Sequence, residues 1–169
     1  MKLIIDQVSI LDSQLKPTAA YAAAAMAGLV GFVNGVRGDE VGPVPGFLVQ
    51  GSNEELAVGI ASGATLTYRL VGMVASIYDL PKQEQANDYI FAEAGQEWIS
   101  VAYLQGLRVQ LEAYATRNEG DTADLTYGLG EALYRSTYGC LTKDNSTSSD
   151  ELGYVAAINA DGTITAVLN

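Results

Sequence analysis

The residues of this chain that could do chemistry are few in type. Among its 169 residues there is no histidine and only one cysteine, Cys140. Without histidine the chain cannot form a Ser-His-Asp or Cys-His catalytic arrangement, nor a metal site with an imidazole ligand. Cys140 stands beside Leu141 in a strand-like segment, so we expect a small buried hydrophobic residue there rather than a nucleophile.

Carboxylates are the remaining candidates for catalysis. Two acids several ångströms apart can support glycoside hydrolysis, and Glu93 with Glu97, or Asp121 with Asp124, are candidate pairs. Such pairs are expected by chance among 20 acidic residues, and no motif organises them. We therefore predict that the chain is not an enzyme and has no catalytic residue.

Two further motifs resemble ligand-binding loops only in part. Oxygen-bearing side chains alternate at positions 144, 146, 148 and 150, but an EF-hand requires Gly and Glu where this chain has Ser149 and Val155. The sequence Gly128-Leu129-Gly130 lacks the other glycines of a phosphate-binding loop, so we expect a turn before a strand. The prediction is no metal and no cofactor.

Charge narrows the class of partner. The formal net charge is −11, only 17% of residues are charged, and 49% are hydrophobic. A chain this acidic lacks the Lys and Arg that would neutralise phosphates, so we expect no nucleic acid and no membrane among its partners. A basic protein surface is the electrostatically complementary partner, and the ten tyrosines suit either an interface or ordinary β-sheet.

The N-terminal 45 residues are interpreted as an arm. Residues 2–11 form a strand-like run, and Lys16-Pro17-Thr18 provides the residue types of a helix start. An Ala-rich segment, 19–33, follows with apolar residues on one helical face. We expect this arm to carry the protein's interface, through Leu3, Ile5, Tyr21, Met26, Leu29, Val30, Phe32 and Val33.

A transmembrane helix is the alternative reading of the arm. Residues 18–36 contain no charge, and Gly31 and Gly35 form a Gly-x-x-x-Gly pair. Ala inserts weakly into bilayers and Asn34 lies near the end of the segment, so packing against protein is favoured.

Residues 46–169 read as a series of short strands. Alternation predicts strands at 65–71, with Leu66, Tyr68 and Leu70 on one face, and at 107–113, with the odd-numbered residues inward. An apolar run at 98–104 predicts a central strand, joined to the next by a tight turn at Gln105-Gly106. Strands on either side of a turn within 131–142, and a closing hairpin over 154–168, complete the series.

The fold class predicted from these elements is mainly β: a β-barrel or sandwich with an N-terminal extended or helical arm. The domain division is an arm at 1–45 and a β-barrel or sandwich domain at 46–169. Regular short strands separated by Gly-rich turns are typical of such all-β domains.

The C-terminal zone resembles a known family. Residues 131–142 (EALYRSTYGCLT), 152–157 (LGYVAA) and 161–169 (DGTITAVLN) are similar to the closing segment of small β-barrel capsid decoration (cement) proteins of tailed bacteriophages. The resemblance covers about residues 89–169 and consists of turn-and-strand patterns. The Ala-rich segment 19–33 has no counterpart in that family.

The resemblance implies a structural role in a virion. It implies binding to the major capsid protein on the outer surface of an icosahedral capsid, stabilisation of that shell, and assembly as a homo-dimer or homo-trimer. The protein would be made in the host cytoplasm. Alternatives are another virion β-protein, such as a tail-tube, head-completion or fibre-base protein, or a membrane-anchored surface β-domain.

Overall fold

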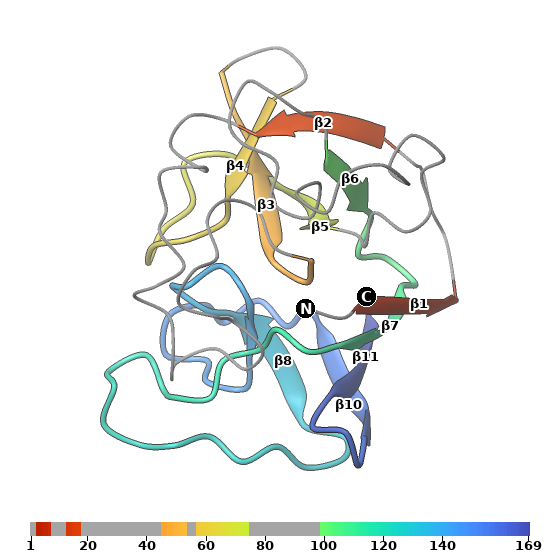
Figure 1. The fold of residues 1–169 in the computed structure, drawn as a ribbon. Coiled ribbons are helices and arrows are strands. Elements are labelled where there is room, and N and C mark those ends of the chain that lie inside the picture. Colours follow the sequence, from red (N-terminus) through yellow and green to blue (C-terminus); the bar gives the residue numbers. More distant parts are fainter. Residues whose placement is uncertain (1–2, 8–12, 18–44, 54–56, 75–98) are drawn as a thin grey trace.

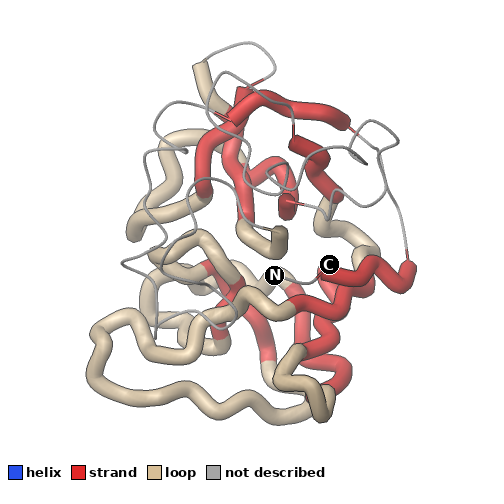
Figure 2. The backbone as a smooth tube through the Cα atoms, in the orientation of Figure 1, coloured by secondary structure: helices blue, strands red, loops and turns tan. Residues whose placement is uncertain are grey.

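The protein is all-β wherever its structure is described. The computed structural model describes residues 3–7, 13–17, 45–53, 57–74 and 99–169, and within these ranges every regular element is a strand (Figures 1 and 2). The mainly β prediction is confirmed for these residues. The predicted Ala-rich helix, 19–33, and the predicted loop at 81–87 lie outside them.

Five strands close into a small barrel at one end of the molecule. Its order is β2 (Ser13–Pro17), β4 (Ala57–Ile60), β3 (Leu48–Gly51), β5 (Leu70–Val74) and β6 (Ile99–Ala102), which pairs again with β2. All neighbours are antiparallel except β2 and β4. Four buried valines, Val49, Val58, Val74 and Val101, form a cluster of their own in this barrel, since β-branched side chains suit pleated, buried positions.

Six strands form a second, fully antiparallel sheet. Its order is β1 (Leu3–Gln7), β7 (Arg108–Leu111), β11 (Ile164–Leu168), β10 (Gly153–Ile158), β8 (Ala132–Arg135) and β9 (Leu141–Thr142). The predicted alternation at 107–113 is confirmed, because Leu107, Val109, Leu111 and Ala113 are all buried. The predicted closing hairpin is also confirmed, as β10 and β11.

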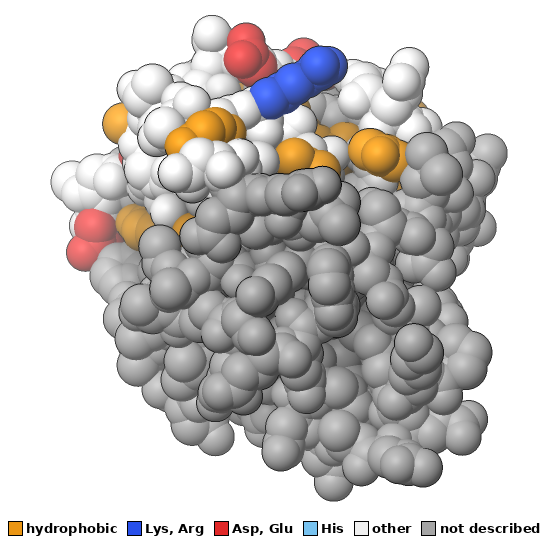
Figure 3. Space-filling view, turned by 90° about the horizontal axis from the view of Figure 1, so that it is seen from above, with side chains coloured by type: hydrophobic (Ala, Val, Ile, Leu, Met, Phe, Trp, Pro, Cys, Tyr) orange, Lys and Arg blue, Asp and Glu red, His pale blue; other side chains and the backbone are white. Residues whose placement is uncertain are grey.

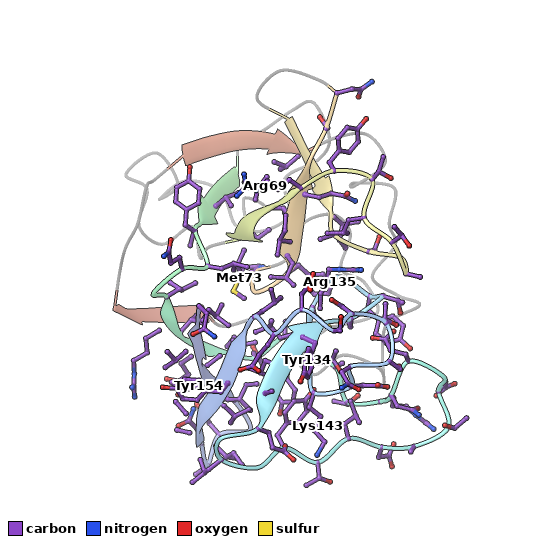
Figure 4. All side chains as sticks on the ribbon, turned by 180° about the vertical axis from the view of Figure 1, so that it is seen from behind. Arg69, Met73, Tyr134, Arg135, Lys143 and Tyr154 are labelled. Carbon is purple, nitrogen blue, oxygen red and sulfur yellow. The ribbon has the colours of Figure 1, made fainter. Side chains whose placement is uncertain are left out.

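The main core lies between the barrel and the six-stranded sheet. Leu48 and Met73 of the barrel belong to the same buried cluster as Leu111, Leu133 and Ile164 of the sheet. Met73 accordingly lies where the barrel meets the sheet (Figure 4). The barrel and the six-stranded sheet therefore bury apolar surface against one another in one main core, beside the separate valine cluster of the barrel.

Both described segments of the predicted arm are strands. β1 pairs with β7 in the six-stranded sheet, whereas β2 pairs with β4 and β6 in the barrel. Of the predicted helix start, Lys16 and Pro17 belong to β2 and pair with Ala57 and Val58, while Thr18, the predicted cap, lies outside the described residues.

The strand predicted at 65–71 is displaced. β5 begins at Leu70, and residues 61–69 run in an irregular conformation. The backbone of this segment is bonded elsewhere: Tyr68 N–H donates to Gln50 Oε1 at 3.0 Å, and several carbonyls accept from Arg135. Of the predicted apolar face, Leu66 and Leu70 pack against the main core, whereas Tyr68 is exposed.

The turn predicted at Gln105-Gly106 is present, but it does not make a hairpin. Leu107 N–H donates to Leu104 C=O at 2.9 Å across it. The strands on its two sides, β6 and β7, belong to different sheets. The turn therefore passes the chain from the barrel to the six-stranded sheet.

Candidate functional site: an apolar surface on the six-stranded sheet

The groups that the sequence offered for catalysis or metal binding are used in structural bonds. Asp121 and Asp124 flank Arg117, whose Nε lies 2.8 and 3.6 Å from their carboxylate oxygens. Asp144 accepts from the backbone N–H of Glu119 and of Ser146, each at 2.9 Å. No group of three or more acidic or cysteine side chains suited to a metal occurs among the described residues, and the pair Glu93 and Glu97 lies outside them.

Cys140 is fully buried, as predicted. Its Sγ lies 3.2 Å from Ser136 Oγ. Burial raises the pKa of the thiol from 9.0 to about 12, against the opposing effect of the Ser136 hydrogen bond. A thiol with this pKa is protonated at neutral pH and is a poor nucleophile.

Cys140 should therefore be unreactive in the folded protein. We expect negligible labelling by a disulfide-exchange reagent at pH 8 and complete labelling in denaturant, which also serves as the control for a free thiol. Since the folded state keeps a proton that the unfolded state releases, the contribution of Cys140 to stability is full below pH 9 and is lost as pH rises toward about 12. Rapid labelling of the native protein would contradict this.

Arg135 clamps the six-stranded sheet to the barrel. It leaves the end of β8, is only 5% exposed, and points toward the segment that precedes β5 (Figure 4). Its Nη1 donates to the carbonyls of Ala61 at 3.1 Å, Gly63 at 2.6 Å and Ser136 at 3.3 Å, and its Nη2 donates to Ala64 at 3.0 Å. Burial lowers the pKa of Arg135, but the guanidinium keeps its charge because its ordinary pKa is so high.

A second set of bonds supports the same junction. The Glu119 carboxylate accepts from Thr137 N–H at 3.1 Å and from the Thr137 hydroxyl. The Thr137 carbonyl in turn accepts from Gly63 N–H at 2.9 Å, and Leu48 N–H donates to Gly139 C=O at 2.7 Å. Gly139 adopts a φ of +86°, which glycine accepts without a steric cost. The turn between β8 and β9 is therefore fixed to the barrel by its backbone.

An ion pair and several hydrogen bonds to the backbone also fix the turn before β8. Lys143 Nζ lies 2.8 Å from Glu131 Oε1 and also donates to Thr126 C=O. The other oxygen of Glu131 accepts from Gly128 N–H at 2.6 Å, and Gly130 N–H donates to Val155 C=O at 2.8 Å. The prediction of a turn at 128–130 is confirmed, and the turn is held against β10.

Exposed apolar side chains gather on this part of the sheet. Leu129, at the tip of that turn, is 71% exposed, and Tyr154 on β10 is 41% exposed. Ala132 and Val167 are the direct cross-strand partners of Tyr154 on β8 and β11, so they share its face. Tyr134, two residues after Ala132 on β8, lies on that face as well (Figure 4).

We call this set of five residues the β10 patch: Leu129, Ala132, Tyr134, Tyr154 and Val167. Ala132, Tyr134 and Val167 are half-buried. An antiparallel sheet commonly presents polar residues on the face that is turned away from the core. On the side seen from above, the described hydrophobic side chains lie in separate groups among backbone, other side chains and a few charged side chains (Figure 3). Arg108, which is exposed and is the register partner of Val167 on β7, borders the patch on the same face.

None of the eight predicted interface residues belongs to the β10 patch. Leu3 and Ile5 lie on β1, where their backbones are in register with Leu111 and Val109. The other six, Tyr21, Met26, Leu29, Val30, Phe32 and Val33, lie outside the described residues, so their role stays a prediction. Sequence reasoning missed the β10 patch, although an isolated Leu between two glycines in a turn was a usable signal.

No described helix is long and apolar enough to cross a membrane; residues 18–36, the predicted alternative span, are not among those described. Comparison with known proteins finds no matching family model, no matching curated protein and no matching solved structure.

Proposed function

We propose that this chain is a non-enzymatic structural protein of a virion, which decorates and stabilises an icosahedral phage capsid by binding the major capsid protein. The observation that carries the proposal is the group of exposed and half-buried apolar side chains in the β10 patch, on a sheet whose turns are fixed by hydrogen bonds and by the Lys143–Glu131 ion pair. A protein that stiffens a shell needs such a rigid, complementary surface and no titratable site. The resemblance of residues 131–169 to decoration proteins supports the same role.

The described acidic and basic groups support binding rather than catalysis. Catalytic acids and bases are recognised by perturbed pKa values together with a cleft that admits a substrate. Here Glu131 has a lowered pKa because it bonds with Lys143 and with the backbone of Gly128, and Arg135 is buried among carbonyls. These interactions hold the fold in place.

Copy number in purified virions tests the proposal. A decoration protein should be present in numbers comparable to the shell subunits, measured by quantitative mass spectrometry against the major capsid protein. Shells that carry it should also withstand heating better than shells stripped of it. A few copies per particle would instead favour a tail-tube, head-completion or fibre-base protein, and absence from virions would overturn both readings.

A further inference from the structure

The six-stranded sheet is built from one stretch of the chain, with a single exception. β7 to β11 all lie within residues 108–168, whereas β1 is separated from them in sequence by the five barrel strands. Among the described strands, β1 pairs with β7 alone (Figure 1). The sheet therefore has an acceptor edge along β7, which is filled by a strand from a distant part of the sequence.

The acceptor edge suits an extended strand with apolar residues at alternate positions. Val109 and Leu111 of β7 are fully buried. Their register partners on β1 are Ile5 and Leu3. When a strand is added to a sheet edge, main-chain pairing supplies affinity and alternate side-chain positions supply specificity. The occupant seen in the structure, Leu3–Gln7 (LIIDQ), thus defines the ligand that this edge accepts.

The other described strands offer no comparable edge. The barrel strands close on themselves. At the far side of the six-stranded sheet, β9 is two residues long, and Leu141 C=O also accepts from Ala115 N–H at 2.9 Å. The register of β1 shifts between Ile5 and Gln7, and such irregularities blunt an edge against further strands. The β7 edge is therefore the place at which copies of this chain can exchange a described strand.

A second copy can supply the same strand at little cost. Its β1 would make the same contacts with β7 as the strand of the same chain, which is why exchange of an identical element is a low-cost route to oligomers. Only five residues, 8–12, join β1 to β2, and β2 is paired within the barrel. A connection of this length spans at most about 20 Å, and short connections favour exchange between copies.

We infer that the β7 edge is a strand-exchange site, at which residues 3–7 of a second copy of this chain replace those of the same chain. Reciprocal exchange leaves no acceptor edge unfilled, so the product is a closed homo-oligomer. The predicted interface residues Leu3 and Ile5 then act at a defined place, β7 of the neighbouring copy. The inference concerns self-assembly and holds whether or not the protein binds a capsid.

Disulfide trapping between register partners tests the exchange. Ile4 and Gln110 are register partners on β1 and β7, and such partners lie close enough for a disulfide. Full-length Ile4→Cys and Gln110→Cys proteins are mixed in urea with reductant, refolded together at low micromolar concentration and then oxidised. We expect a disulfide-linked pair of chains on non-reducing electrophoresis. Cys140 is buried in both variants and should not take part.

The matched control uses two strands of the contiguous stretch. Thr165 of β11 is also a register partner of Gln110. A mixture of Thr165→Cys and Gln110→Cys proteins should give no linked pair, because β7 and β11 are not exchanged. Equal linkage in both mixtures would show non-specific oxidation and overturn the inference. So would an internal disulfide in the Ile4→Cys/Gln110→Cys double variant without linkage in the mixture, or no disulfide in either, which would mean that β1 and β7 do not pair in this register.

Sedimentation of the natural protein gives the second readout. We expect a discrete oligomer, and we expect a variant with eight Gly and Ser residues inserted between positions 9 and 10 to sediment as a monomer, because a longer connection lets β1 return to its own chain. A monomeric natural protein, or an oligomer that the insertion leaves unchanged, would overturn the exchange. Virion copy number is read separately, so a low copy number would remove the decoration role and leave the strand exchange intact.

Discussion

Replacing Arg135 with Met is expected to lower the free energy of unfolding by about 3 kcal/mol. The change keeps an apolar stem but removes the donors to four carbonyls, those of Ala61, Gly63, Ala64 and Ser136. The carbonyls of Gly63 and Ala64 are in exposed residues and can bond to water instead. Ala61 and Ser136 are fully buried. The cost comes mainly from the buried Ala61 carbonyl, which is left without a donor, together with the loss of charge-assisted bonds; the Ser136 carbonyl keeps the Gly139 N–H at 3.1 Å.

Urea denaturation followed by circular dichroism measures this loss, and Arg69→Met is the control. Arg69 is exposed, so its replacement should change stability by no more than about 0.5 kcal/mol. The Arg135 variant should also be cleaved faster by chymotrypsin after Tyr68, because the segment that Arg135 holds is released. Equal stability and equal cleavage for the two variants would show that Arg135 does not clamp the sheets.

Substituting Ala for Gly153 should be comparably damaging, at about 3 kcal/mol. Gly153 starts β10 and pairs with Leu168 on one side and Leu133 on the other. A Cβ at this position would lie 2.1 Å from the Val167 carbonyl oxygen and 2.8 Å from Leu168 Cα. Because both obstacles are backbone atoms of a central strand, the clash can be relieved only by separating β10 from β11.

Gly120→Ala is the matched control for this second variant. A Cβ at Gly120 would meet only Thr122 side-chain atoms, at 3.8 and 3.9 Å, which are ordinary contact distances. We expect Gly120→Ala to have a stability within about 0.5 kcal/mol of the natural protein in the same denaturation experiment. A Gly153 variant as stable as the Gly120 variant would mean that β10 and β11 do not pair as closely as described.

The sequence alone was sufficient wherever local pattern and burial coincide. The alternation of residues 107–113, the hairpin at 154–168, the turn at 128–130 and the burial of Cys140 were all predicted, and the structure confirms each of them. In these segments the period of two, or the Gly residues of a turn, fixes the conformation within a few neighbouring residues. The absence of histidine likewise settled from composition which catalytic arrangements are impossible.

Tertiary structure decided the features that depend on distant parts of the chain. The alternation of residues 65–71 predicts a strand. Arg135, more than 70 residues away, instead donates to the carbonyls of Ala61, Gly63 and Ala64, just before that segment. Lys16 and Pro17 lie in a strand because β2 pairs with β4 and β6, which come from distant parts of the sequence. A sequence window contains neither partner, so local propensity could not anticipate either outcome.

The candidate site also depends on contacts between distant parts of the chain. The five residues of the β10 patch, Leu129, Ala132, Tyr134, Tyr154 and Val167, come from three separate stretches of sequence. They become one surface only because β8, β10 and β11 pair in a particular register and the turn before β8 bonds to Val155. Composition determined that the chain is acidic and without histidine; pairing between distant strands determined where its apolar side chains meet on the surface, because register alone decides which residues share a face.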